Sequence, residues 1–276
     1  MNKFVIILGV SADIGLNICK SYIKDGFQVL GTYRKFTDNM KEIENLQGLT
    51  LFKCDVTQEK DICKLVELVH DKGILWTSFF SSVGTSEPIG NFFEIPFEIW
   101  EHSIQINCLG QLHALHALFK YRASEITPNI IFLAGGGTNN PFKCYSAYCV
   151  SKIMLIKMCE LLDDENPDLN IFIIGPGFVK TKTHLETIKA GHSAGDNYER
   201  VKIFLESDDN GTPVEKIYEC IRYFESKGKK VASGRNFSVV HDVWGNEELA
   251  VELEKDINMY KLRRYKNDWH GGNCEK

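Results

Sequence analysis

Short apolar runs alternate with longer amphipathic stretches along most of the chain. The short runs are rich in β-branched and aromatic residues and predict strands at 3–8, 27–32, 49–53, 74–80, 129–134, 169–174 and 236–241. The longer stretches, with apolar residues at helical spacing, predict helices at about 13–25, 58–71, 97–122, 145–164 and 213–226. Near-continuous runs such as IIFLA and IFII are typical of parallel strands covered on both faces. The pattern predicts an α/β fold, a doubly wound parallel seven-stranded sheet of the Rossmann type flanked by helices.

No repeat, low-complexity tract or linker interrupts this pattern, so residues 1–245 are expected to form one domain. The last stretch, 246–276, does not continue the alternation. Residues 246–264 have a charged, helical pattern, and the polar tail beyond them contains glycines. We expect a C-terminal helical extension and tail that packs on the domain, reaches a neighbouring subunit or frays.

The composition is that of an ordinary globular chain, with 43% hydrophobic and 25% charged residues and a formal net charge of −5. This acidic balance argues against a nucleic-acid partner, because phosphate binding needs a basic face. No apolar run approaches the length of a membrane span, and the apolar stretch 4–8 is too short for a signal peptide. Nine cysteines without a CxxC pair predict a reduced, cytoplasmic chain. The pair His113 and His116 has no third ligand nearby, so no metal is expected.

The first chemical signal is a glycine-containing turn between the first predicted strand and helix, Gly9-Val-Ser-Ala-Asp-Ile-Gly15. Gly9 permits a tight turn, and Gly15 permits the helix to approach the strand or a ligand closely. Ser11 is placed to donate to a phosphate or to cap the helix, whose N-terminus offers free N–H groups to a pyrophosphate. Asp13 repels a phosphate, so its side chain must point away or cap the helix N-terminus.

The end of the second predicted strand indicates which dinucleotide would fit. NAD-binding proteins usually carry an acid there, which holds the ribose 2′-hydroxyl. Here the sequence is Gly31-Thr-Tyr-Arg-Lys35, and no acid precedes Asp38. Arg34 and Lys35 would attract a 2′-phosphate, which favours NADP(H) over NAD(H). The alternative is that the two cations belong to a solvated loop.

Tyr148 and Lys152 stand four residues apart near the start of the helix predicted at 145–164, and therefore share a helix face. A free phenol has a pKa of about 10 and is a poor base at neutral pH. A neighbouring ammonium favours the phenolate, so we expect Lys152 to lower the pKa of Tyr148. Tyr148 is then suited to protonate a carbonyl oxygen as a hydride arrives, or to deprotonate an alcohol in reverse.

In this order, the motifs resemble those of the short-chain dehydrogenase/reductase family, in its compact single-domain branch, from about residue 3 to residue 241. Asp55-Val56 looks like the pair that contacts the adenine, and Ser81-Ser-Val-Gly84 keeps only the glycine of the family's Asn-Asn-Ala-Gly. Asp13 stands where a middle glycine is usual. The residues that look like the family's cofactor-binding turn are Gly9, Ser11, Asp13, Ile14 and Gly15.

The resemblance also implies catalytic residues. Tyr148 and Lys152 match the family's catalytic pair, which also contacts the cofactor, and Asn107 matches a helix asparagine that holds a water in the proton relay to the lysine. The segment Pro176-Gly177-Phe-Val-Lys-Thr181 resembles the one that closes over the nicotinamide. The resemblance implies that Val179 and Thr181 contact the carboxamide.

One departure concerns the serine that the family places before its tyrosine to hydrogen-bond the substrate oxygen. The matching position here is Gly135, in Ala134-Gly-Gly-Gly-Thr138, and it offers no hydroxyl. Removing one such donor costs other enzymes about 10²–10³ in rate. We expect Thr138, a backbone N–H or a water to take its place.

Residues 182–212 stand where the family closes its substrate pocket, and their glycines and polar side chains predict a mobile, polar lid. A solvated helical insert is the alternative. The glycine loop and the C-terminal tail have a looser similarity to members associated with bacterial surface-polysaccharide gene clusters, which implies a sugar-derived or otherwise polyhydroxylated substrate. The polar lid residues of interest are His184, His192, Tyr198, Glu199 and Arg200.

These features predict an NADP(H)-dependent oxidoreductase that transfers a hydride between nicotinamide and a small-molecule ketone or secondary alcohol. Gly135 motivates the alternative of a cofactor-binding protein with weak or no catalysis, a sensor or scaffold. Epimerisation or dehydration of a nucleotide sugar ranks below both. The resemblance implies a homodimer or homotetramer, paired through the helices predicted at 97–122 and 145–164. No nucleic-acid, membrane or metal partner is expected.

Overall fold

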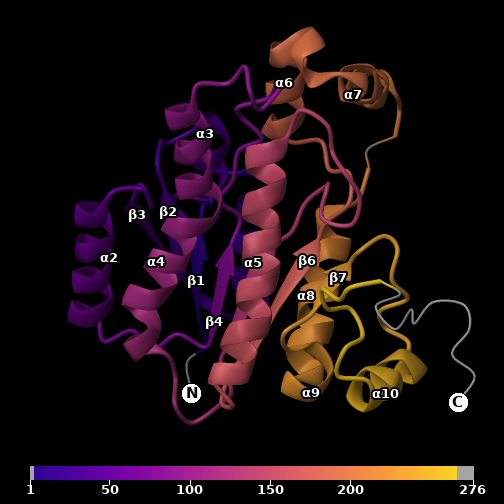
Figure 1. Ribbon diagram of the computed structural model, residues 1–276. Helices are drawn as coiled ribbons and strands as arrows, with labels where there is room; N and C mark the ends of the chain where they lie inside the picture. Colours follow the sequence, from indigo (N-terminus) through magenta and orange to yellow (C-terminus); the bar gives the residue numbers. More distant parts are fainter. Residues whose placement is uncertain (1–2, 210, 266–276) are drawn as a thin grey trace, which may run out of the picture.

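A computed structural model describes residues 3–209 and 211–265. Within these residues, seven parallel strands form one sheet in the order β3-β2-β1-β4-β5-β6-β7 (Figure 1). The order reverses between β1 and β4, so the carboxyl ends of these strands form the switch point of a doubly wound sheet. The predicted fold class is confirmed. The strands are β1 Phe4–Leu8, β2 Gln28–Tyr33, β3 Leu49–Lys53, β4 Ser78–Ser81, β5 Asn129–Leu133, β6 Asn170–Gly175 and β7 Asn236–Ser238.

Helices cover both faces of the sheet (Figure 1). One face packs against α1 (Asp13–Lys24) and α8 (Val214–Lys227). The other packs against α2 (Glu59–Asp71), α4 (Gly110–Leu118) and α5 (Ser146–Glu165). Successive strand residues point to opposite faces, so Val5 and Ile7 belong to the first core, and Ile6 and Leu8 to the second. Burial on both sides explains why β1, β5 and β6 are almost entirely apolar.

The helix predicted at 97–122 is a series of shorter segments. α3 (Phe97–Ile104) leads through a π-helical turn, η2 (Gln105–Leu109), into α4, and a 3₁₀ turn, η3 (Phe119–Tyr121), ends the series. The carbonyl of Tyr121 accepts from the N–H of Trp76 at 3.0 Å, and Trp76 forms an isolated bridge with Arg122. Because the backbone around Trp76 is paired there, β4 begins at Ser78 and not at residue 74.

Two C-terminal elements are also shorter than predicted. β7 ends at Ser238 and not at 241, because Ser238 Oγ accepts from the N–H groups of Val240 and His241 and turns the chain. Helix α10 spans Glu247–Lys255, inside the predicted 246–264. Residues 266–276 of the predicted tail lie outside the described residues.

Some helical segments were not predicted individually. α6 and α7 stand above the carboxyl ends of the strands, at the top of Figure 1, where the lid was expected. No helix in the described part of the chain is long and apolar enough to cross a bilayer. The additional segments are η1 (Asp38–Glu42), α6 (Lys182–Ala190), η4 (Gly191–Ala194), α7 (Asp196–Glu206) and α9 (Lys229–Ala232).

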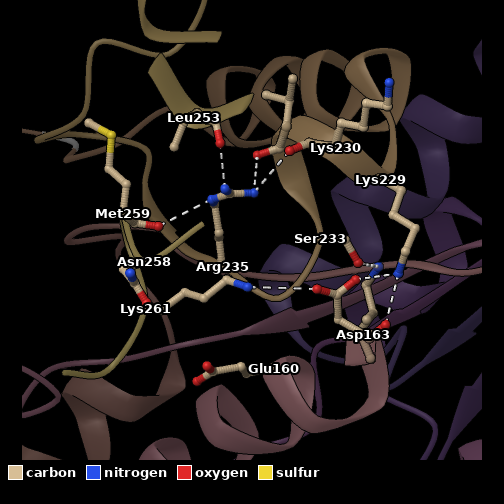
Figure 2. Close-up of polar contacts among 12 residues, drawn as sticks. Glu160, Asp163, Lys229, Lys230, Ser233, Arg235, Leu253, Asn258, Met259 and Lys261 are labelled. Atoms are coloured by element: carbon tan, nitrogen blue, oxygen red, sulfur yellow. Dashed lines mark hydrogen bonds and ion pairs between the residues drawn. The ribbon is translucent and has the colours of Figure 1, made fainter. Parts of the chain in front are cut away.

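Arg235 fastens the C-terminal extension to the domain (Figure 2). Its side chain is buried, at 3% exposure, and the guanidinium donates to backbone carbonyls at 2.6–3.2 Å. Most of these carbonyls lie near the C-termini of α9 and α10, where helical partners run out and a cation is favourable. The acceptors belong to Lys230, Val231, Leu253, Asp256 and Met259.

Ion pairs attach the same extension to α5. Asp163 pairs with Lys261 at 3.7 Å, and Glu160 pairs with Arg263 at 2.8 Å. Asp163 also pairs with Lys229 of α9, which belongs to the domain. In the described residues, the extension therefore packs on the domain, and residues 260–262 line the larger cavity of the site below.

Candidate active site

A cleft opens at the carboxyl ends of the strands and consists of two adjoining cavities. They share residues 82–85, Ala12 and Lys182 along their border. The Arg34 cavity, about 460 Å³, is lined by Gly9, Ser11, Arg34, Lys35, Asp55 and Val56, among others. The Tyr148 cavity, about 720 Å³, is lined by Asp13, Ile14, Gly135, Thr138, Tyr148, Lys152, Pro176, Gly177, Val179 and Thr181, among others. Gly84 borders both, whereas Gly15 and Asn107 lie behind the lining.

The glycine turn packs too tightly for side chains at its two ends. An ideal Cβ at Gly15 would lie 2.3 Å from Ser82 Oγ and 2.4 Å from the carbonyl oxygen of Gly9. Gly9 has a φ of +84°, in the left-handed region that favours glycine. Ser82 Oγ donates to the Gly9 carbonyl at 2.8 Å, so the loop after β4 holds the turn in place. The start of α1 consequently borders the cleft, as a phosphate site requires.

Asp13 caps a helix other than the one it begins. Its Oδ2 accepts from the backbone N–H of Lys182, the first residue of α6, at 3.2 Å. A carboxylate is favourable there because the helix N-terminus carries unsatisfied N–H groups and the positive end of the dipole. We expected Asp13 to point away or to cap its own helix, whereas its carboxylate caps α6 across the cleft.

Two cations stand at the rim of the Arg34 cavity. Arg34 and Lys35 are exposed, and neither side chain has a hydrogen bond or ion pair within residues 3–209 and 211–265. Asp38, the first acid after β2, pairs instead with Lys41 at 2.9 Å. Asp55 accepts at Oδ1 from the backbone and hydroxyl of Thr57. Both cations are therefore available to an anionic ligand.

Asn107 holds the loop after β4 against the catalytic candidates. It is buried in the π-helical turn η2, and its side chain accepts from Thr85 N at 2.8 Å and donates to Thr85 O at 2.9 Å. Its own carbonyl accepts from Gln111 Nε2 at 2.6 Å. An ideal Cβ at Gly84 would lie 3.3 Å from Asn107 Oδ1 and 3.8 Å from Lys152 Nζ. The expected part of Asn107 in a proton relay stays a prediction.

Tyr148 and Lys152 lie one turn apart on α5 and both line the Tyr148 cavity. Lys152 Nζ donates to the carbonyl of Leu133 at 2.8 Å and lies 5.7 Å from the centroid of the Tyr148 ring. Burial lowers the pKa of Lys152 to about 8. Burial also raises the pKa of Tyr148 above its ordinary value, and the charges of Cys149 and Glu186 add to the rise. Without a bound cofactor, burial therefore holds the pKa of Tyr148 above its ordinary value, opposite to the lowering expected from Lys152.

The phenol of Tyr148 occupies the space that a side chain at position 135 would take. An ideal Cβ at Gly135 would lie 1.9 Å from the Tyr148 hydroxyl oxygen and 2.5 Å from Cζ. Thr138 Oγ1 donates to the carbonyl of Gly135 at 3.3 Å. No group in the described part of the chain hydrogen-bonds the phenolic hydroxyl, and the expectation that Thr138, a backbone N–H or a water replaces the missing serine stays a prediction.

The segment predicted as a lid, called the lid below, consists of α6, η4 and α7, and α6 is held across the cleft at two points. Besides the Asp13 contact, Glu186 accepts from Ser86 N and Ser86 Oγ, both at 2.7 Å, and from Thr85 Oγ1 at 3.1 Å. Of the lid residues singled out from the sequence, His184 and Arg200 line the Tyr148 cavity. The residues found to line neither described cavity are His192, Tyr198 and Glu199.

The sequence analysis missed a hydrogen-bond network that links the lid to the N-terminus of α5. Tyr145, 1% exposed, lies with its hydroxyl 2.9 Å from Thr187 Oγ1 and accepts from Asn197 Nδ2 at 2.9 Å. Its ring stacks on Phe142 with the centroids 4.2 Å apart. Neither these residues nor Glu186 belong to a recognisable motif. The polar character of residues 182–212 was the only sequence signal for Glu186, Thr187 and Asn197, and Tyr145 lies outside that segment.

The chain is similar to known proteins over most of its length. Residues 3–190 match the family profile described as short chain dehydrogenase. Benzil reductase ((S)-benzoin forming) of Saccharomyces cerevisiae is 26% identical over 195 residues, which cover 66% of this chain and 73% of the relative.

Two solved structures show the same fold. A crystal structure of a short chain dehydrogenases/reductase from Saccharomyces cerevisiae gives a TM-score of 0.78 at 19% identity, over 91% of this chain and 99% of that chain. ElxO with NADP bound gives a TM-score of 0.70 at 20% identity, over 87% and 97%. The profile match spans the glycine turn, Asn107, Tyr148, Lys152 and the first lid helix.

Proposed function

The chain belongs to the short-chain dehydrogenase/reductase family of nicotinamide-dependent oxidoreductases, and on that premise we propose that it transfers a hydride between NADP(H) and a ketone or secondary alcohol. One observation carries the proposal: Tyr148 and Lys152 line a single cavity that adjoins the glycine turn. A phenol and an ammonium in that place can move the proton that accompanies hydride transfer.

The residues of the cleft fit a dinucleotide. The turn excludes side chains at Gly9 and Gly15, the N-terminus of α1 borders the cleft, and the two cavities join past Gly84. A bound nicotinamide cofactor supplies or accepts the hydride. Arg34 and Lys35 would hold a 2′-phosphate, the arginine by a bidentate fork, and β2 is not followed by an acid that would hold a 2′-hydroxyl. This supports NADP(H) over NAD(H).

Tyr148 is the proposed proton donor. Its raised pKa keeps the phenol protonated, which suits reduction of a carbonyl, the direction that consumes a proton. Lys152, with a pKa of about 8, is mostly charged at neutral pH and stabilises the phenolate left by proton transfer. Asn107 is a positioning residue, because its side chain holds Thr85 at the border of both cavities.

The lining of the Tyr148 cavity supports a sugar-derived or otherwise polyhydroxylated substrate. A pocket fixes the orientation of its ligand through a small number of placed polar groups. Hydroxyls and amides from the glycine loop and from the lid converge here. These groups belong to Thr138, Asn139, Asn140, Tyr145, Thr187 and Asn197.

We further propose that the protein forms a homodimer or homotetramer through α4 and α5 with the segments that precede α4. Apolar side chains at Leu109, Val150 and Leu161 are 39–43% exposed on these elements. Pairing of these faces would remove them from water. Sedimentation at micromolar concentration tests this, and a monomer would contradict it.

The decisive experiment follows NADPH oxidation by the purified protein against a panel of keto sugars and simpler ketones. We expect reduction of at least one ketone, and a loss of about 10²–10⁴ in rate for Tyr148→Phe, the usual contribution of a general acid. NADPH binding, followed by fluorescence titration, should survive this substitution. Tight NADPH binding without oxidation by any ketone would favour the alternative of a non-catalytic sensor or scaffold.

A further inference from the structure

The lid presents an arginine without an ionic partner to the Tyr148 cavity. Arg200, on α7, is exposed and lines this cavity, and its guanidinium carbon lies over the ring of Phe178, 4.4 Å from the centroid. Because Phe178 lines the same cavity, this contact places the charged end of the arginine next to the cavity wall. Over residues 3–209 and 211–265, the guanidinium has no hydrogen bond or ion pair. Its N–H donors are therefore available to a ligand.

Aromatic contacts hold the ring on which the guanidinium rests. Phe178 meets Phe204 of α7 edge-on, with the centroids 5.1 Å apart. His184 of α6 lies 5.3 Å from Phe178 and 5.2 Å from Phe204. Burial lowers the pKa of His184, so its ring is uncharged at neutral pH and does not repel the arginine. A guanidinium stacked on a fixed ring loses less freedom when it binds a ligand than a free side chain does.

The charges of the described cavity lining favour an anion. Its two acids already accept from backbone N–H groups, Asp13 from Lys182 at 3.2 Å and Asp242 from Ser238 at 2.6 Å. Lys182 borders both cavities, where the phosphates of a dinucleotide would pass, whereas Arg200 borders the Tyr148 cavity alone. Arg200 is therefore placed for the substrate and not for the cofactor. The lysines and the arginine of this lining are Lys152, Lys182, Arg200 and Lys261.

We propose that Arg200 binds an anionic group of the substrate, a carboxylate or a phosphate, through a bidentate contact. The substrate is then a ketone, or the corresponding alcohol, that carries an acid group apart from its reacting carbon. This inference rests on the proposed ketone reduction and makes Arg200 a specificity-determining residue for it. An acidic or phosphorylated sugar derivative would satisfy both this contact and the polar lining of the cavity.

The test compares kcat/KM, with NADPH, for matched ketones that differ in charge. The carboxylate arm pairs acetoacetate and levulinate with their methyl esters, and the phosphate arm pairs dihydroxyacetone phosphate with dihydroxyacetone. Each pair is measured in the wild type, Arg200→Gln and Arg200→Lys. The intrinsic reactivities of the ketones cancel, because the ratio within a pair is compared between proteins. Lys202→Gln is the matched control, because Lys202 is exposed on the same helix and lines neither cavity.

We expect the wild type to prefer the anionic member of at least one pair. This preference should fall by about tenfold or more in Arg200→Gln, the usual effect of losing a hydrogen bond to a charged group. Arg200→Lys should keep part of the preference, because the charge remains and the fork is lost. Lys202→Gln should change it far less, because salt screens a charge outside the cavity. The arm that responds identifies the anion.

The inference is overturned if the wild type prefers the anionic member of no pair, or if the preference persists in Arg200→Gln. An equal fall in Lys202→Gln also overturns it, because the effect would then belong to the general charge of the lid. A weaker NADPH affinity in Arg200→Gln with unchanged ratios would assign the guanidinium to the cofactor instead. Melting temperatures report on folding, and if Arg200→Gln does not fold, Arg200→Met is judged by the same ratios.

Failure of the proposed function would look different. In that case the wild type binds NADPH and oxidises it with no ketone of the panel, and the inference falls with it. If the wild type reduces ketones but the ratios do not depend on residue 200, only the inference fails.

Discussion

Returning a serine to position 135 should inactivate this enzyme, although it restores the residue usual in the family. An ideal Cβ there would lie 1.9 Å from the Tyr148 hydroxyl oxygen and 2.7 Å from Cε1, where ordinary contact begins at 3.4 Å. The phenol would have to withdraw by about 1.5 Å, the difference between 3.4 and 1.9 Å. A misplacement of about 1 Å at a reacting group can cost about 10²-fold in rate. We therefore expect kcat to fall at least about 100-fold in Gly135→Ser and in Gly135→Ala alike.

The assay is ketone reduction with saturating NADPH, together with NADPH titration and thermal melting. Because the obstructed atoms are at the far end of a side chain, Tyr148 can swing aside and the protein should still fold and bind cofactor. Gly136→Ala is the matched control, because its Cβ would meet Phe142 at ordinary distances of 3.5 and 3.6 Å. Gly136→Ala should change the free energy of unfolding by no more than about 0.5 kcal/mol. The reasoning is refuted if kcat of Gly135→Ser equals or exceeds that of the wild type while kcat of Gly135→Ala falls. That result would show that the site lacks only a hydroxyl.

Three further predictions concern other parts of the molecule. Arg34→Gln should raise KM for NADPH about tenfold or more and leave NADH nearly unaffected, since a charge-assisted bond of about 1.5–3 kcal/mol is lost; equal changes for both cofactors would count against a 2′-phosphate contact. The rate of ketone reduction should decline as pH rises through about 8, where Lys152 loses its charge; a profile flat well above this pKa contradicts the role given to the ammonium. Arg235→Leu should lower the free energy of unfolding by about 3 kcal/mol or more, because several buried carbonyls lose their donor. Arg263→Ala, at an exposed ion pair, should cost about 1 kcal/mol or less in the same urea titration, and equal losses would argue against the Arg235 anchor.

The sequence was sufficient for the sheet because each strand carries its own signal. Ile6 and Val5 face different helices, and a strand buried on both faces has to be apolar throughout. The turn at Gly9 and the Tyr148–Lys152 pair on α5 could also be found from the sequence, because the geometry of each is set by residues only a few positions apart. Element ends were less predictable, because β4 and β7 are shortened by pairing with distant backbone and by a local hydroxyl.

The functional details that were missed depend on contacts between distant residues. Asp13 and Lys182 meet although they are 169 positions apart, and no local pattern marks either as the partner of the other. The rise in the Tyr148 pKa follows from burial, which spacing does not report. The clash at Gly135 likewise depends on the direction of a ring from another element.

The two attachments of the C-terminal extension should respond unequally to acid. Carbonyl acceptors do not titrate and a guanidinium keeps its proton, so the anchor at Arg235 holds wherever the domain is folded. Burial alone would raise the pKa of Glu160, but hydrogen bonds from Arg263 and Lys157 bring it below its ordinary value. Its contribution to stability is therefore complete above the unfolded pKa and is lost as the pH falls through the lower folded value. As the pH falls, the amide hydrogens of the segment around Arg263 should therefore exchange before those of α10. The part of the cleft wall next to this segment would then loosen in acid, while the part held by Arg235 stays in place.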